Sequence, residues 1–379
     1  MKVSYVNGIC VKNDAISAAI HQEILWLTST KRHTVRLFAY VCEYKDVLFT
    51  KVDHLSEVAY DDFFQSSDLI IFHFGVFYPF FDLLMMAPAT RVVVFHNITP
   101  PSLVARVHLQ TVEKSFRQMS NIQFSDYVIC ASQTNQDMLR ENGISVDGSV
   151  APLAVRGMPE KIPVKSSRND GRVRLVFIGR FVKSKGPMDL MFALEQLLDS
   201  IDRICVNLDL ISNLNFADPS VFEEIELMSG NIQRRFGSRT EINIHGNASD
   251  VTKERLLSAA DIFILPTYHE GFCIPIVEAL GNGCIVICYD NSNTPSISGG
   301  LAKLVPTGDT KALSLALRTS AEMIGTTEWL GSGEASFEQY ASRAREHAHR
   351  YSPDVSKQFF INLIEKIQTT KHPRICARV

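Results

Sequence analysis

The chain contains the run Asp261-Ile262-Phe263-Ile264-Leu265-Pro266-Thr267-Tyr268-His269-Glu270-Gly271-Phe272-Cys273-Ile274-Pro275-Ile276-Val277-Glu278. Its apolar first part predicts a buried strand of a parallel sheet, because such strands are covered on both faces. A loop with Glu270 follows, and Pro275 suits the first position of a new helix, which puts Glu278 in the first helical turn. Side chains beyond the carboxyl end of such a strand face the crevice where open α/β sheets bind ligands. Free N–H groups at the helix start favour an anion such as phosphate.

The spacing Glu270-x7-Glu278, with an internal Gly-Phe-x-x-Pro, resembles the signature of glycosyltransferase family 4, the retaining transferases of the GT-B architecture. The resemblance implies that Glu270 contacts hydroxyl groups of the donor sugar and that Glu278 holds the ribose of the nucleotide. It also implies that the residues between them line the donor, namely Gly271, Phe272, Cys273 and Ile274. The family often has a further glycine where this chain has Cys273, so the sequence departs from the pattern where the backbone would lie against the sugar.

The composition, with 46% hydrophobic and 21% charged residues in a chain of 379, is that of an ordinary soluble globular protein. This length is enough for two domains that each have a core. A net charge of −3 gives no electrostatic footprint for nucleic acid. Several of the eight cysteines lie in apolar runs, which predicts reduced core residues of a cytoplasmic protein rather than disulfides. We expect neither a signal peptide nor a transmembrane span.

Short apolar runs alternate with helical stretches, which is typical of parallel α/β layers. The expected strands are Lys2–Val6, Thr34–Ala39, Leu69–Phe74, Arg91–Phe95, Tyr127–Cys130, Arg172–Ile178, Cys205–Ile211, Glu241–His245, Asp261–Leu265 and Cys284–Cys288. Residues 151–171 are rich in proline, serine and charge, which predicts an exposed linker. We therefore expect a Rossmann-like acceptor domain over residues 1–155, a Rossmann-like donor domain over 172–350 and a terminal helix within 351–379. The resemblance adds that the two sheets face a cleft and that the last helix crosses back to the first domain.

A second polar cluster follows the predicted strand 173–178, in the run Gly179-Arg180-Phe181-Val182-Lys183-Ser184-Lys185-Gly186-Pro187. Arg180 offers a planar fork for phosphate oxygens, and Lys185 offers a compact positive charge. Together they could hold a diphosphate and stabilise it as it leaves. The resemblance agrees, because Gly-Arg followed by Lys-Gly binds the donor diphosphate in family 4. The alternative is a solvated surface loop, which is the better interpretation for either cation alone.

No Asp-x-Asp motif, which would hold a divalent ion on the diphosphate, follows a predicted strand. A protein that supplies arginine and lysine to the leaving group has less need of that ion. We therefore expect metal-independent transfer without a cofactor.

The predicted first domain carries the run His96-Asn97-Ile98-Thr99-Pro100-Pro101 directly after a strand. A histidine there can bond a sugar hydroxyl or share a proton with the acceptor, because its pKa lies near neutrality. The run resembles a motif of family 4 members that build bacterial surface polysaccharides, which favours a catalytic role for His96 over that of a loop residue. His73, near the end of the preceding strand, competes for the same acceptor region.

Gly8 follows the first strand, where Rossmann-like folds bring the backbone close to a phosphate or sugar, and it is a weaker candidate for donor binding. Asn13 and Asp14 fit a helix cap better than a ligand site. Residues 77–86 are unusually apolar; we prefer core packing, and the alternative is a surface that meets a lipid-linked acceptor or the membrane. Lys114 and Arg117 could bind an acceptor phosphate or anionic lipid, or be solvated helix charges.

These features predict a retaining hexosyltransferase that moves a sugar from a nucleotide-diphospho-sugar, of the UDP-glucose or GDP-mannose type, to a saccharide or lipid-linked saccharide. Surface polysaccharide synthesis is the expected process, in the cytoplasm or peripherally at the inner face of the membrane. The alternatives are a non-catalytic nucleotide-sugar-binding protein, a sugar-nucleotide epimerase and a sugar phosphorylase on the same fold. The phosphorylase lacks any sequence feature that points to its aldehyde cofactor.

Overall fold

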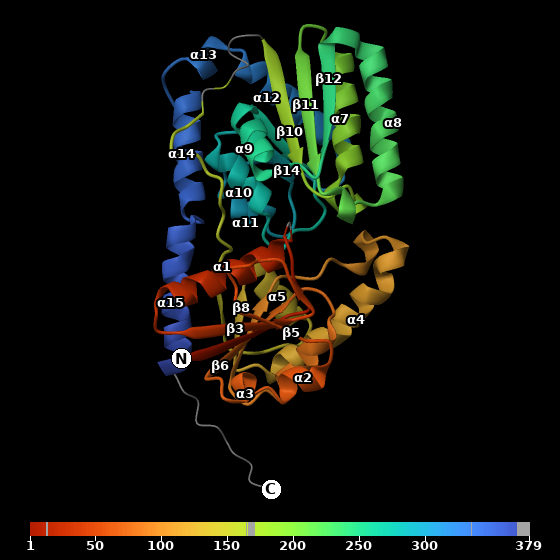
Figure 1. Ribbon diagram of the computed structural model, residues 1–379. Coiled ribbons are helices and arrows are strands. Elements are labelled where there is room, and N and C mark those ends of the chain that lie inside the picture. The colour runs from red at the N-terminus through yellow and green to blue at the C-terminus, as the bar shows by residue number, and fades with distance from the viewer. Residues whose placement is uncertain (13, 164, 166–170, 335, 370–379) are drawn as a thin grey trace. The chain divides into compact units, whose positions relative to one another are not determined.

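The computed structural model describes residues 1–12, 14–163, 165, 171–334 and 336–369. The chain forms two compact α/β units, each with its own parallel sheet (Figure 1). Unit 1 comprises Met1–Ile98, Gln110–Ala154 and Pro353–Val379; unit 2 comprises Thr99–Leu109 and Val155–Ser352. The segment Thr99–Leu109 thus groups with the second unit, although the sequence had placed it in the first domain.

The main sheet of unit 1 has seven parallel strands in the order β5-β3-β1-β6-β7-β8-β9. Their bounds are β1 Lys2–Val6, β3 Thr34–Ala39, β5 Phe49–Lys51, β6 Leu69–Phe74, β7 Thr90–Phe95, β8 Tyr127–Cys130 and β9 Gly148–Val150. Two short strands pair separately, β2 Ile9–Cys10 and β4 Val41–Cys42. The helices are α1 Ala15–Ser29, α2 Leu55–Ala59, α3 Asp62–Gln65, α4 Leu109–Met119, α5 Gln133–Glu141 and α15 Pro353–Thr369.

The last helix completes the core of unit 1. Four apolar side chains of α15 join the cluster formed by β1, β3, β6 and α1, namely Phe360, Leu363, Ile364 and Ile367. The ring of Phe360 lies 5.9 Å from that of Trp26 on α1. The apolar residues of α15 recur at helical spacing, so one face of the helix is buried.

Unit 2 has a six-stranded parallel sheet in the order β12-β11-β10-β13-β14-β15. The strands are β10 Arg172–Ile178, β11 Cys205–Ser212, β12 Thr240–Gly246, β13 Ile262–Leu265, β14 Ile285–Tyr289 and β15 Lys303–Val305. The helices are α7 Pro187–Ser200, α8 Pro219–Phe236, α9 Asp250–Ala259, α10 Ile274–Gly281, α11 Thr294–Ser298, α12 Thr310–Ile324, α13 Thr327–Leu330 and α14 Phe337–His349. Helix α7 packs between α8 and α12, and α10 packs against α14; α7 and α8 lie side by side in Figure 1.

The strand order of unit 2 reverses at β10, which pairs with β11 on one side and with β13 on the other. Strands β13 and β14 are buried along their whole length, as their continuous apolar sequences predict. Because all the strands are parallel, the loops after β10, β13 and β14 leave the same edge of the sheet. This is the place where doubly wound sheets bind their ligands.

Most of the apolar segment 77–86 belongs to the core of unit 1. It forms the 3₁₀ turn η1 Pro79–Met85, in which Phe80 and Phe81 are fully buried. The ring of Phe80 stacks on that of Tyr40 at 4.4 Å. The alternative that these phenylalanines meet a membrane or a lipid-linked acceptor is therefore wrong, because their side chains are buried in a hydrophobic core cluster of unit 1.

The substitution Phe80→Ser should lower the free energy of unfolding by about 3–5 kcal/mol, the usual cost of emptying a buried phenylalanine site. Met86→Ser in the same segment is the matched control, because Met86 is 68% exposed. Urea unfolding of both variants measures the difference. Equal stability of the two variants would contradict the burial of Phe80.

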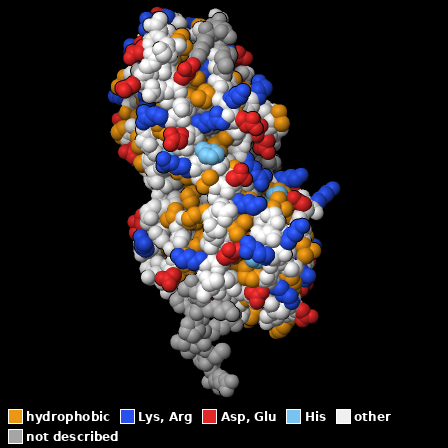
Figure 2. Space-filling view, turned by 90° about the vertical axis from the view of Figure 1, so that its left-hand side faces the viewer, with side chains coloured by type: hydrophobic (Ala, Val, Ile, Leu, Met, Phe, Trp, Pro, Cys, Tyr) orange, Lys and Arg blue, Asp and Glu red, His pale blue; other side chains and the backbone are white. Residues whose placement is uncertain are grey.

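The face shown in Figure 2 carries no large region of one charge over the described residues. On the face shown in Figure 2, basic and acidic side chains alternate over the described residues. No helix among the described residues is long and apolar enough to cross a membrane. The seven described cysteines are free, and Cys130, Cys284 and Cys288 are buried, as predicted for core thiols.

Candidate active site

The loop after β10 places the two predicted phosphate-binding cations at the ligand edge of unit 2. The buried ring of Phe181 anchors this loop, and its N–H donates to Ser212 Oγ. Arg180 is exposed, and its side chain has no ion pair with another residue in the described ranges. Lys185 lies in the 3₁₀ turn Lys183–Lys185 and is mostly buried, with 16% of its side chain exposed.

Gly186 lets this loop lie directly against the loop after β13. It adopts a left-handed conformation with φ 61°, and an added Cβ would lie 2.1 Å from the carbonyl oxygen of Pro266. Two hydrogen bonds to Ser184 O hold the same contact, from Thr267 Oγ1 at 3.1 Å and from Tyr268 N at 2.8 Å. Glycine is required here for both its conformation and its size.

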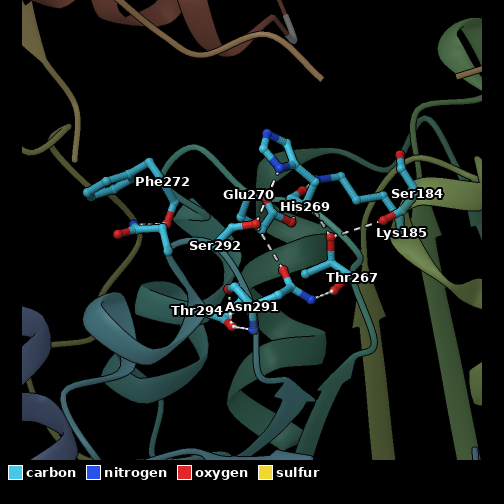
Figure 3. Close-up of polar contacts among 10 residues, drawn as sticks. Ser184, Lys185, Thr267, His269, Glu270, Phe272, Asn291, Ser292 and Thr294 are labelled. Carbon is cyan, nitrogen blue, oxygen red and sulfur yellow. Dashed lines mark hydrogen bonds and ion pairs between the residues drawn. The ribbon is translucent and has the colours of Figure 1, made fainter. Parts of the chain in front are cut away.

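Lys185 and Glu270, predicted from two separate motifs, form an ion pair. Lys185 Nζ lies 2.6 Å from Glu270 Oε1 and also contacts His269 O at 3.5 Å (Figure 3). Only 10% of the Glu270 side chain is exposed, so the pair is largely shielded from solvent. The sequence predicted both residues at the donor, and the structure brings the two charged groups together at one point.

Glu278 is paired with a cation that the sequence did not reveal. Lys253 Nζ, on α9, lies 2.7 Å from Glu278 Oε1. Burial raises the pKa of Glu278, and Lys253 opposes this shift. Burial by itself lowers the pKa of Lys253, but the nearby carboxylates, Glu278 first among them, together outweigh it and the net pKa is raised. No motif marks Lys253, because it is brought to Glu278 by the packing of α9 beside α10.

The start of α10 is open to an anion. Its N-cap residue Cys273 has φ 78° and makes no side-chain cap. Pro275 has no N–H and Ile276 N donates to Cys273 O, so of the first three helical residues only Ile274 can offer its N–H to an anion. Burial raises the pKa of the Cys273 thiol well above its usual range, so this thiol is neutral. The helix begins at Ile274, one residue before the expected Pro275, and Glu278 therefore lies in the second turn rather than the first.

The loop after β14 forms hydrogen bonds to the loop after β13, which carries Glu270. Asn291 Nδ2 donates to Thr267 O at 2.8 Å (Figure 3). Asn293 Nδ2 donates to Phe272 O at 3.0 Å. Ser292 Oγ bonds His269 Nδ1 at 3.3 Å. The loops after β10, β13 and β14 therefore form one hydrogen-bonded group, in which the segment from Gly271 to Ile274 is held between fixed neighbours.

In unit 1 the two candidate histidines, His96 and His73, differ in their access to a ligand. His96 follows β7 and is half-buried, whereas His73 on β6 is 1% exposed. The expectation that His73 contacts an acceptor directly is therefore wrong, because its side chain is enclosed between the sheet and α1. Its Nδ1 instead lies 2.8 Å from His96 Nε2.

Gly8 has a structural reason to be small. It is buried, and an added Cβ would lie 3.2 Å from Cβ of Tyr78. The packing of Tyr78 therefore accounts for this glycine without a ligand. Asp14 caps α1 by accepting from Ser17 N at 2.8 Å, as predicted, and Asn13 lies outside the described residues.

Lys114 and Arg117 are exposed on α4, as solvated helix charges would be. The ammonium group of Lys114 lies 5.4 Å from the centre of the Phe77 ring. Within the described ranges no group of three histidine, cysteine or acidic side chains is arranged to hold a metal ion.

Comparison with known proteins finds a glycosyltransferase family match over the part of the chain that holds these residues. Residues 159–321, which contain all the unit 2 residues above, match the family described as glycosyl transferases group 1. The chain is 32% identical over 69 residues to O-antigen chain mannosyltransferase B of Escherichia coli, which is 18% of either protein. It is 26% identical over 181 residues to the MMP alpha-(1->4)-mannosyltransferase of Mycolicibacterium hassiacum, which is 46% of this chain and 41% of that protein. The chain thus matches less than half the length of either relative.

The fold is shared over almost the whole chain with a solved glycosyltransferase from Rickettsia africae ESF-5. The TM-score is 0.75 at 13% identity, with 98% of this chain and 99% of that chain covered. These matches confirm the predicted GT-B fold and the predicted resemblance to glycosyltransferases of this kind.

Proposed function

We propose that this chain, whose residues 159–321 match the family described as glycosyl transferases group 1, is a retaining hexosyltransferase that uses a nucleotide-diphospho-sugar. The observation that carries the proposal is the ion pair of Lys185 with Glu270 at the ligand edge of unit 2, 2.6 Å long. Lys185 is a cation for the diphosphate, and Glu270 beside it is an acceptor for hydrogen bonds from sugar hydroxyls. In a donor molecule the diphosphate and the sugar are likewise neighbours, on either side of the bond that breaks.

In this proposal the leaving diphosphate gains negative charge as the sugar departs. Lys185 and Arg180 stabilise that charge, and the N–H of Ile274 at the start of α10 supplies a further donor. Glu270 accepts hydrogen bonds from the sugar, which fixes its position relative to the diphosphate. Glu278 accepts from the ribose, with Lys253 holding its carboxylate.

The first donors to test are GDP-mannose and UDP-glucose, and mannose takes precedence because two relatives are named mannosyltransferases. The acceptor we propose is a saccharide or lipid-linked saccharide of a surface polysaccharide. Incubation with donor, with and without saccharide acceptors, tests the reaction. Acceptor-dependent release of nucleoside diphosphate supports it, whereas conversion of the sugar by donor alone would show an epimerase, and no turnover would favour a binding protein.

Transfer should not depend on a divalent ion, because Arg180 and Lys185 supply the positive charge to the diphosphate. We expect EDTA to leave the rate within about twofold of the untreated enzyme, while removal of an essential ion would abolish turnover. A rate measured in EDTA, then with excess magnesium or manganese, checks this. Loss of activity in EDTA with recovery in either metal would refute metal-independent transfer.

Peripheral membrane contact is proposed only for the exposed cations of α4, since the phenylalanines of η1 are core. Lys114 and Arg117 would attract anionic head groups, an interaction that salt screens. Flotation with anionic vesicles at low and high salt tests this, and equal recovery of wild type and the Lys114→Glu, Arg117→Glu variant would refute it. The cytoplasmic location stays a prediction.

A further inference from the structure

A chain of buried polar side chains leads to His96 in unit 1. Glu23 Oε2, on α1, lies 3.0 Å from His73 Nε2 on β6. His73 Nδ1 lies 2.8 Å from His96 Nε2, just beyond β7, and the two rings stack with their centres 5.0 Å apart. Glu23 and His73 are 6% and 1% exposed, so both are removed from solvent. Neither residue has a part in the proposed chemistry described above.

A fourth group fixes the inner end of this chain. Tyr5 on β1 donates its hydroxyl hydrogen to Glu23 Oε2 at 3.2 Å. Burial, together with the Glu23 charge, raises the pKa of Tyr5 well above its usual range, so the hydroxyl remains protonated. As a carboxylate, Glu23 only accepts hydrogen bonds, and Oε2 receives one from Tyr5 and one from His73 Nε2–H.

The proton positions then follow along the chain. In its neutral form His73 has one N–H group and uses it toward the Glu23 carboxylate, and Nδ1 of that form is an acceptor. His96 must therefore donate from Nε2, and its other nitrogen, Nδ1, carries a lone pair. Burial, and next the neighbouring His73, lower the pKa of His96 well below its usual range, so the ring is neutral near pH 7.

His96 Nδ1 is also available to a ligand. The described residues include no hydrogen-bond partner for Nδ1, nor is it among their buried, unpaired polar atoms. The backbone fixes the residue, because His96 N donates to Phe74 O at 2.8 Å. His96 lies at the carboxyl edge of its parallel sheet, where such folds take ligands.

We propose that Glu23 and His73 are positioning residues that hold His96 in the Nε2–H tautomer, so that Nδ1 accepts a hydrogen bond from a sugar hydroxyl. The chemical class follows from the lone pair, because a hydroxyl can donate to it whereas an unprotonated phosphate oxygen cannot. The identification of the ligand as a sugar rests on the proposed function, but the tautomer does not. The hydroxyl belongs either to the donor sugar or to the acceptor.

The tautomer can be measured without any substrate. Two-bond ¹⁵N–¹H spectra of histidine-labelled protein near pH 8 should show His96 protonated at Nε2 and bare at Nδ1. His73 should show the same tautomer. A proton on His96 Nδ1 would overturn the proposal, since His73 would then be donating to His96. This result does not depend on whether the protein transfers sugars.

Activity tests whether Glu23 acts through His96. Glu23→Gln should lower kcat/KM about tenfold, because the amide can donate to His73 and reverse both tautomers. Glu113→Gln, on the exposed face of α4, is the matched control and should have no effect. In the His96→Asn background, where an amide oxygen can occupy the place of Nδ1, Glu23→Gln should have no further effect.

The kinetic constants assign the hydroxyl. If Glu23→Gln raises the KM for the donor, the hydroxyl that bonds His96 Nδ1 belongs to the donor sugar. If it raises the KM for the acceptor, the hydroxyl belongs to the acceptor. If Glu23→Gln lowers kcat/KM by the same factor in the wild-type and His96→Asn backgrounds, the positioning role is refuted. If Glu23→Gln fails to fold, the wild-type spectrum still decides the tautomer.

Discussion

The substitution Lys185→Gln should lower kcat by about 10²- to 10³-fold, the usual effect of removing one donor to a developing negative charge. Lys185 Nζ is the cation nearest to Glu270, and its side chain is only 16% exposed. In such a site solvent screens the charge little, so its loss from the leaving diphosphate is not compensated by water. Initial rates at saturating donor measure the effect.

The same substitution removes the partner of Glu270, so stability has to be measured with it. A largely buried carboxylate without its cation destabilises a fold. The variant Lys185→Gln with Glu270→Gln keeps a neutral hydrogen bond in place of the ion pair and should melt nearer to wild type, yet remain inactive. Arg203→Ala is the control, because it removes an exposed cation before β11, at the opposite edge of the sheet. Full activity of a folded Lys185→Gln variant would refute the role of Lys185.

The two glutamates should differ in what their replacement weakens. Glu270→Gln should lower kcat about a hundredfold and leave the affinity for a bare nucleoside diphosphate nearly unchanged, because its partner in the proposal is the sugar. Glu278→Gln should weaken that affinity about tenfold, the value of one hydrogen bond to a charged group. Calorimetric titration and initial rates separate the effects.

Glu328→Gln provides the matched control for the loss of one carboxylate, since Glu328 is exposed on α13. Glu278 is also the partner of Lys253 at 2.7 Å, so Lys253→Met should weaken nucleotide affinity in the same direction. Equal losses of nucleotide affinity in Glu270→Gln and Glu278→Gln would show that the sugar and ribose roles are misassigned.

The sequence predicted the main strands of both sheets closely, because buried parallel strands are continuous apolar runs. The expected strand 172–178 is β10 itself, and Asp261–Leu265 differs from β13 by one residue. It did not reveal β5, β9 or β15, which have three residues each and are mostly half-buried. Such short edge strands form because a neighbouring strand offers hydrogen bonds. Their own sequences have no pattern that predicts a strand.

The site shows the same limit. Motifs predicted Lys185 and Glu270, but not their ion pair, because the two residues are 85 positions apart and meet only through the pairing of β10 with β13. Lys253 had no motif. Glu23 did leave a sign in the sequence, since it lies in the apolar stripe of α1 with Ile20, Ile24 and Leu27. A charged residue on such a stripe predicts a buried partner, which is His73.

Nucleotide binding tests the central claim most directly, since it requires neither the acceptor nor the right sugar. Melting curves with uridine, guanosine and adenosine diphosphates, run on wild type and Lys185→Gln, are the measurement. One diphosphate should stabilise the wild-type protein by about 2.7 kcal/mol at a hundred times its dissociation constant, and the variant should need a much higher concentration. No stabilisation by any of the three at millimolar concentration, or equal stabilisation of the two proteins, would contradict a donor site at Lys185 and Glu270.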